Sequence, residues 1–364
     1  TSRQLFSVLN AVQSYDWLAV SRSTGSILRG LTSVGFYLLW GIEGAIVGYC
    51  VGDVISAIIS LSASRGYLGY DGRWESPVTV LRLGAPFLAA SVCSNIRSRV
   101  DYFIVGALGG AEPLAVYFVA QKIYEYLGQF TRYLLDTTQT KISEKAAEEP
   151  AELPRSFERC TRYFFLGLVP AYATAAALSS VIIAAYAGGK YSEASGVLAV
   201  LCGGGIVGGL YALQRRYVLV IGKKWHPVAI DAASMVFHAG LIALFMVLLG
   251  SIGAAIGKMA AAIPLLIFTS FLLSEVLSPK YDVAAAVLGL AASATIVAVT
   301  VVALHLLSTT IGGIVGVTLI VPTYYLFVRR RLHERDLSML FELIPRQLRS
   351  RSCTQKVKMF LNRE

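Results

Sequence analysis

Charged side chains are scarce in this chain. Asp, Glu, Lys and Arg make up only 15% of the residues, whereas hydrophobic residues make up 55% and the mean hydropathy is +0.63. A soluble domain of comparable length carries more charge on its surface. The composition therefore excludes an ordinary soluble protein and indicates a chain that crosses a membrane.

Motifs that signal chemistry are missing as well. The sequence has no phosphate-binding glycine loop, no zinc-binding helix motif and no nucleophile elbow. Its five cysteines are scattered without metal-ligand spacing, so we interpret them as small core residues. We expect no enzyme activity, no cofactor and no bound metal.

Apolar runs recur along the whole chain. A helix needs about 20 apolar residues to cross the hydrocarbon core of a bilayer. The pattern predicts an all-α, polytopic membrane protein with about ten transmembrane helices. The predicted spans are residues 26–40, 44–62, 82–108, 113–136, 163–186, 194–214, 228–249, 253–276, 284–306 and 311–328.

Basic residues are distributed unevenly between the connections. The 32 Lys and Arg residues fall mostly in alternate connections and near the two ends, while the other connections contain Lys190 alone. Because basic residues near span ends stay cytoplasmic, both termini are predicted to be cytoplasmic, in a multi-pass protein of the cell membrane. This topology explains the net charge of +10 without a nucleic-acid partner.

A glycine motif is repeated at the predicted outer turns. Gly41-Ile-Glu-Gly44-Ala-Ile-Val-Gly48 recurs 209 residues later (position 250 minus position 41) as Gly250-Ser-Ile-Gly253-Ala-Ala-Ile-Gly257. A shorter third copy, Gly312-Gly-Ile-Val-Gly316, lies at the last outer turn. Glycines at this spacing allow sharp turns and close helix approach, and their equivalent places predict an internal repeat.

The repeat predicts how the chain is organised. If the first two spans correspond to the seventh and eighth, four spans are expected upstream of Thr1, and the N-terminal lobe is incomplete. Both copies run in the same direction through the membrane, as in parallel-repeat transporters with two rocking lobes. The predicted parts are an N-lobe remnant at 1–64, a cytoplasmic linker at 65–80, a six-helix C-terminal lobe at 81–276, an additional helix pair at 277–328 and a basic cytoplasmic tail at 329–364. The tail is expected either to lie on anionic lipid as a helix or to be solvated.

Three short segments carry a family resemblance. They read Leu83-Gly-Ala-Pro86-Phe-Leu, Asp101-Tyr-Phe-Ile-Val-Gly106-Ala-Leu-Gly109 and Ala115-Val-Tyr117-Phe-Val-Ala120-Gln-Lys-Ile123. The chain resembles the polysaccharide-biosynthesis, O-antigen-type flippases of the multidrug/oligosaccharidyl-lipid/polysaccharide (MOP) exporter superfamily, and these segments resemble the seventh and eighth helices of that family. Residues 8–31 resemble the junction between its fourth and fifth helices, in agreement with a missing N-terminal part.

The resemblance implies a function and a class of partner. The chain is expected to flip a lipid-linked oligosaccharide, on a polyprenyl- or dolichyl-phosphate or diphosphate, from the cytoplasmic to the outer leaflet by alternating access. Membrane lipids and the glycan polymerase or ligase machinery are the other implied partners. Two alternatives stay open: a cation-coupled drug or metabolite exporter of the same superfamily, and a passive scramblase or scaffold subunit.

Charged residues inside the third and fourth predicted spans are the candidate substrate site. Ionisable groups inside a membrane are costly and face a cavity or each other, so they mark function by default. With a helix rise of about 1.5 Å per residue, they lie roughly 14–18 Å below the outer helix ends, near the bilayer midplane. The candidates are Arg97, Arg99, Asp101, Lys122 and Glu125.

These charges have two interpretations. In the structural one, Arg97 pairs with Asp101 one helical turn away, and Lys122 pairs with Glu125. In the functional one, the surplus positive charge binds the phosphate or diphosphate of the substrate. Because Arg97 and Arg99 are two residues apart, about 200° around a helix, one of the two is expected to be structural.

Other polar residues are weaker candidates. Asp53 is expected either to pair with a basic group of the other lobe or to titrate as a coupling carboxylate. Tyr124 and Tyr126 are candidates for stacking on sugar rings in a cavity. Lys258 is expected to extend its amine to the outer surface rather than to act in the cavity.

Overall fold

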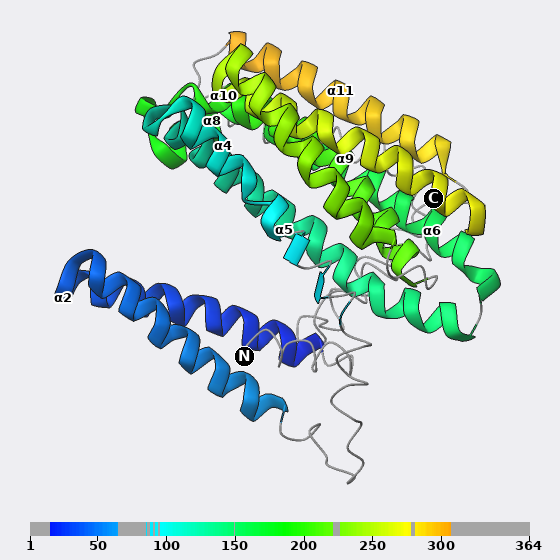
Figure 1. Ribbon diagram of the computed structural model, residues 1–364, viewed down its shortest axis with the longest axis horizontal. Helices are drawn as coiled ribbons and strands as arrows, with labels where there is room; N and C mark the ends of the chain where they lie inside the picture. The colour runs from blue at the N-terminus through cyan, green and yellow to red at the C-terminus, as the bar shows by residue number, and fades with distance from the viewer. Residues whose placement is uncertain are drawn as a thin grey trace, which may run out of the picture. The chain divides into compact units, whose positions relative to one another are not determined.

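The computed structural model describes residues 15–64, 85, 88–89, 92–93, 95–148, 150–220, 226–277 and 281–306. Every regular element in these ranges is helical, so the predicted all-α fold is confirmed. The predicted linker 65–80, the last span 311–328, the third glycine copy and the tail 329–364 lie outside the described residues. The elements are α2 (Tyr15–Ser64), α4 (Val100–Gly109), α5 (Ala111–Glu148), η2 (Pro150–Glu152), α6 (Leu153–Tyr163), η3 (Phe164–Leu168), α7 (Val169–Ala177), α8 (Ser179–Ala187), η4 (Gly189–Tyr191), α9 (Ala194–Val220), α10 (His226–Leu277) and α11 (Val283–Leu306) (Figure 1).

The chain divides into two compact units. One contains α2, and the other contains all described elements from α4 to α11. In the first unit, α2 is a hairpin of two helices that reverses at Trp40 and Gly41 (Figure 1). Gly41 has φ 65° and ψ −143°, a conformation open almost only to glycine. The turn predicted at this motif is therefore confirmed.

Helix α10 of the second unit repeats this turn. Gly250 breaks the helix with φ 64° and ψ −146°. Close packing is repeated as well: a Cβ on Gly44 would lie 2.1 Å from the carbonyl oxygen of Phe36, and a Cβ on Gly253 would lie 1.9 Å from that of Phe245. The two glycine motifs thus build the same local structure.

Four described segments are long and apolar enough to cross a membrane: Ser23–Ile59, Ala194–Val220, Asp231–Glu275 and Val283–Leu306. A fifth arises if Leu153–Ala177 and Ser179–Ala187, which meet at a 68° bend, form one crossing. Two of the four contain the glycine breaks of α2 and α10. The apolar helices define a multi-pass membrane protein.

The predicted span 163–186 is not a straight helix. It contains the π-helical turn η3, Pro170 near the start of α7, and the bend before α8. Proline lacks the backbone N–H that an uninterrupted helix uses, which favours such irregular turns.

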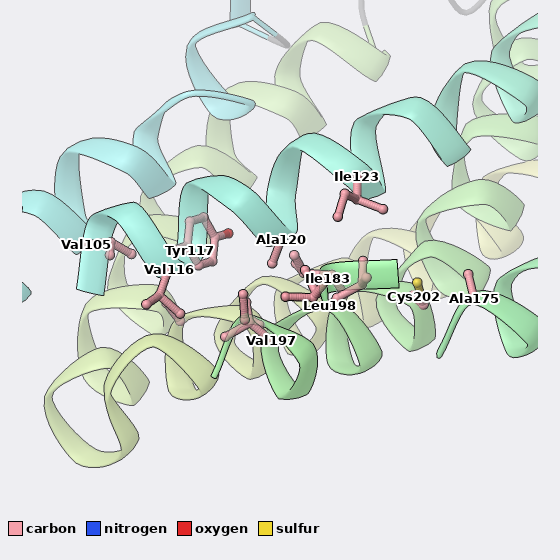
Figure 2. Packing of buried hydrophobic residues seen from close by; sticks show 14 of the residues in the cluster. Val105, Val116, Tyr117, Ala120, Ile123, Ala175, Ile183, Val197, Leu198 and Cys202 are labelled. Carbon is pink, nitrogen blue, oxygen red and sulfur yellow. The ribbon is translucent and has the colours of Figure 1, made fainter. Parts of the chain in front are cut away.

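Helix α9 is central to the packing of the second unit. It packs against α5, α7, α8 and α10, while α4 packs against α5 and α10, and α11 packs against α7 and η3. Val197, Leu198 and Cys202 of α9 are buried against apolar side chains of α5, including Val116 and Ala120 (Figure 2). This core fixes α4, α5, α9 and α10, the four helices whose charged residues are described next.

Candidate functional site

The segment that contains Arg97, Arg99 and Asp101 is not one regular helix. Residues 95–97 are helical, Ser98 and Arg99 form a turn, and α4 begins at Val100. In this turn the backbone N–H of Arg99 donates to the carbonyl of Ile96 at 3.0 Å. The four-residue spacing of Arg97 and Asp101 therefore does not make them neighbours on one helix face.

Asp101 is a fully buried carboxylate with two side-chain donors. The Lys258 amine of α10 lies 2.5 Å from its Oδ2, and the Tyr117 hydroxyl of α5 donates to the same oxygen at 3.0 Å. Lys258 also lies 5.9 Å from the centre of the Tyr124 ring. The expectation that Lys258 extends to the outer surface is wrong: a buried carboxylate offers its ammonium a partner, and the ion pair joins α10 to α4.

Arg97 pairs with Asp231 rather than with Asp101. Its guanidinium is 3.6 Å from the Asp231 carboxylate, which also accepts from Arg215 at 2.8 Å and from the Tyr211 hydroxyl at 2.8 Å. The predicted Arg97–Asp101 pair is thus replaced by two pairs to α10, because the turn at Ser98 separates the two side chains.

Sequence reasoning missed Asp231 and Arg215. Asp231 lies just inside the predicted span 228–249 and is fully buried. Its signal was available, since a carboxylate inside an apolar run needs a partner. Arg215 lies directly after the predicted span 194–214, and the packing of α9 against α10 brings it to Asp231.

A second group of charges is more exposed. The Glu125 carboxylate lies 3.2 Å from the Lys122 amine and 3.8 Å from the Arg99 guanidinium, and it accepts from the Tyr102 hydroxyl at 3.3 Å. The side chains of Arg99, Lys122 and Glu125 are 57%, 35% and 25% exposed. The predicted Lys122–Glu125 pair is confirmed. Arg99 also pairs with Glu125, so the group has three charged residues.

The remaining candidates form no ion pair or hydrogen bond with this group among the described residues. Tyr124 is packed in the core against the Tyr172 ring, with centroids 6.3 Å apart, whereas Tyr126 is 53% exposed. Asp53 belongs to the first unit and pairs within its own hairpin with Arg29 at 3.2 Å. Among the described residues, no three His, Cys, Asp or Glu side chains gather as metal ligands would.

The charges of the second unit thus fall into two kinds. Asp101 and Asp231 are fully buried and have strong donors from neighbouring helices, so they join α4, α9 and α10. Glu125, Lys122 and Arg99 form a partly open group with two cations and one carboxylate. Inside an apolar bundle, such a group needs an aqueous space or a polar ligand beside it.

Glycine-broken hairpins and charged residues inside an apolar helical bundle define a multi-pass membrane protein. The chain belongs to the polysaccharide biosynthesis protein family, whose pattern it matches over residues 7–196. No curated protein matches it at a significant level.

Solved structures support this fold. One is the inward closed conformation of the lipid II flippase MurJ, with a TM-score of 0.69 at 17% identity, covering 90% of this chain and 70% of that one. MATE in the straight conformation matches with a TM-score of 0.59 at 16% identity over 76% of this chain and 66% of that one. A mutant of MATE gives the same score and identity over 71% and 62%. These likenesses concern the fold alone.

Proposed function

We propose that this exporter flips a lipid-linked oligosaccharide from the cytoplasmic to the outer leaflet by alternating access of two lobes. The family match and the fold of a lipid II flippase support this substrate class. A ligand drives such a change only through its different affinity for the inward and outward states. The headgroup therefore needs a binding group that is accessible in the membrane interior.

The open group of Arg99, Lys122 and Glu125 is the observation that carries the proposal. One cation more than carboxylate leaves a positive charge for an anion. We assign Arg99 and Lys122 to the phosphate or diphosphate of the substrate, because a guanidinium offers a two-pronged donor and an ammonium a point charge. Glu125 fixes both cations and prevents their mutual repulsion from separating them.

Arg97 and Asp101 are assigned a different role. Both are engaged in buried ion pairs with α10, so they position the binding group rather than contact the phosphate. Asp53 is likewise paired within its hairpin.

Complementation tests the proposal. The full chain is expressed in a host that lacks its own oligosaccharide flippase, and surface glycan is measured at matched membrane levels of protein. Loss of one charge-assisted hydrogen bond weakens binding by about 1.5–3 kcal/mol, so Arg99→Ala and Lys122→Ala should reduce surface glycan about tenfold or more at limiting substrate. Lys190→Ala, which removes an exposed cation of η4, is the matched control and should leave glycan unchanged.

Each other outcome contradicts the proposal. Normal glycan in both variants would remove Arg99 and Lys122 from the substrate path. A wild-type chain that gives no glycan but shows ion-dependent efflux of small molecules would favour the drug or metabolite exporter. Headgroup movement that survives neutralisation of Arg99 and Lys122 would favour a passive scramblase.

A further inference from the structure

Helix α5 carries a polar face that extends beyond the open group. Besides Lys122 and Glu125, this face contains Gln129, seven residues after Lys122, and Arg132, ten residues after Lys122. At about 100° per residue, these four side chains project within a sector of about 80°. With a rise of about 1.5 Å per residue, the face is about 15 Å long from Lys122 to Arg132.

The opposite face of α5 packs in the hydrophobic core of the second unit. Val116, Ala120 and Ile123 are buried against α9 and its neighbours (Figure 2). The polar face therefore points away from the packed interior of the second unit. Arg132 is exposed and forms no ion pair with the described residues, and Gln129 is half-buried without a side-chain hydrogen bond to them. Two strongly polar groups are thus left with capacity for a ligand.

A phosphate alone does not account for this length. Arg99 and Lys122 suffice to bind a compact anion, and both lie at one end of the face. The rest of the face offers an amide and a guanidinium, the donors and acceptors that pair with sugar hydroxyl groups. Tyr126 borders the face, about 40° from Lys122, and its exposed ring suits stacking on a sugar ring.

We propose that Gln129, Arg132 and Tyr126 form an extended glycan subsite that follows the phosphate group along α5 and selects for headgroups of several sugars. This inference rests on the proposed function and adds to it where the sugars lie. Its structural basis is the exposed ring of Tyr126 together with the polar atoms of Gln129 and Arg132, which have no hydrogen bond or ion pair to the described residues. A single sugar next to the phosphate would reach Glu125 but not Arg132, because two helical turns separate them.

Binding to two lipids tests the subsite. The purified full chain is titrated with a polyprenyl diphosphate that bears one sugar and with the same lipid bearing a linear pentasaccharide. Each net hydrogen bond lost is equivalent to about threefold to tenfold in Kd. Gln129→Ala and Arg132→Ala should raise the Kd for the pentasaccharide lipid by that factor and leave the Kd for the single-sugar lipid unchanged.

Matched variants separate this inference from the proposed function. Arg99→Ala and Lys122→Ala should weaken both lipids equally, and Lys190→Ala should weaken neither. Arg132→Gln, which keeps a donor, should restore part of the loss seen with Arg132→Ala, and thermal unfolding in the same detergent verifies that each variant is folded.

The results are decisive in either direction. Equal weakening of both lipids by Gln129→Ala and Arg132→Ala, or no effect on either, would overturn the glycan subsite while the phosphate site stands. Loss of folded protein in both Arg132 variants would show that this face packs against another part of the chain and would also overturn it. Failure of the wild type to bind either lipid would overturn the proposed function itself.

Discussion

Gly41 and Gly250, in separate units of the chain, have the same backbone conformation. Their φ angles are 65° and 64°, and their ψ angles are −143° and −146°. Each breaks a long apolar helix into a hairpin. In each hairpin, a Cβ on the glycine three positions later would clash with a carbonyl oxygen of the preceding helix. The repeat seen in the sequence is therefore a repeat of structure.

Gly250→Ala should destabilise the second unit. Conformations of this kind cost a side-chain-bearing residue about 1–3 kcal/mol, and nothing else crowds the position. The melting temperature in detergent should fall. Gly240→Ala on the same helix is the control, because Gly240 is exposed and has no neighbour within 4 Å, so its replacement should be neutral or slightly stabilising. Equal melting temperatures for the two variants would contradict the strained turn.

The Asp101–Lys258 pair should behave as a buried ion pair. Asp101→Asn leaves the Lys258 ammonium without its carboxylate, and Lys258→Met leaves the carboxylate without its cation. Each single change should reduce the free energy of unfolding by about 3–5 kcal/mol. The double variant should lose less than the sum of the two, because no unpaired charge stays behind. Strict additivity in this double-mutant cycle would show that the two residues do not interact.

Removing Arg97 should lower the amount of folded protein in the membrane, whereas removing Arg99 should not. Asp231→Asn and Arg97→Ala disturb a buried network and should lower the amount of folded protein in the membrane. Arg99→Ala removes a side chain that is 57% exposed and should leave protein abundance unchanged. Quantitative immunoblots of membrane fractions measure this, with Arg155→Ala, an exposed surface position, as the control. Normal abundance of Asp231→Asn would argue against a structural network.

Gly209 and Gly208 form a matched pair on α9. A Cβ on Gly209 would lie 2.6 Å from the Phe164 ring, whereas a Cβ on Gly208 would meet nothing within 4 Å. Gly209→Ala should therefore destabilise by about 1–3 kcal/mol through overpacking. Gly208→Ala should be neutral or stabilise by up to about 1 kcal/mol, as alanine does in helices. Thermal unfolding of the two variants side by side provides the measurement, and an identical response would mean that Phe164 moves aside without cost.

Composition and periodicity determined the class of this protein. Scarce charge and long apolar runs specify helices in lipid, since only helices satisfy their own backbone hydrogen bonds there without closing a sheet into a barrel. The glycine motifs at Gly41 and Gly250 specified the turns, because that backbone conformation admits almost no other residue. The pair Lys122–Glu125 was predictable for the same local reason, a three-residue spacing on one helix.

The tertiary structure decided which charges are buried and which stay open. The spacing of Arg97 and Asp101 suggested a pair, yet a turn at Ser98 separates them and each finds its partner on α10. Lys258 and Asp231 meet these partners from positions more than a hundred residues away, and such distant pairings depend on how α4, α9 and α10 pack. Sequence spacing specifies neighbours within a helix, whereas the meeting of helices depends on the side chains buried between them.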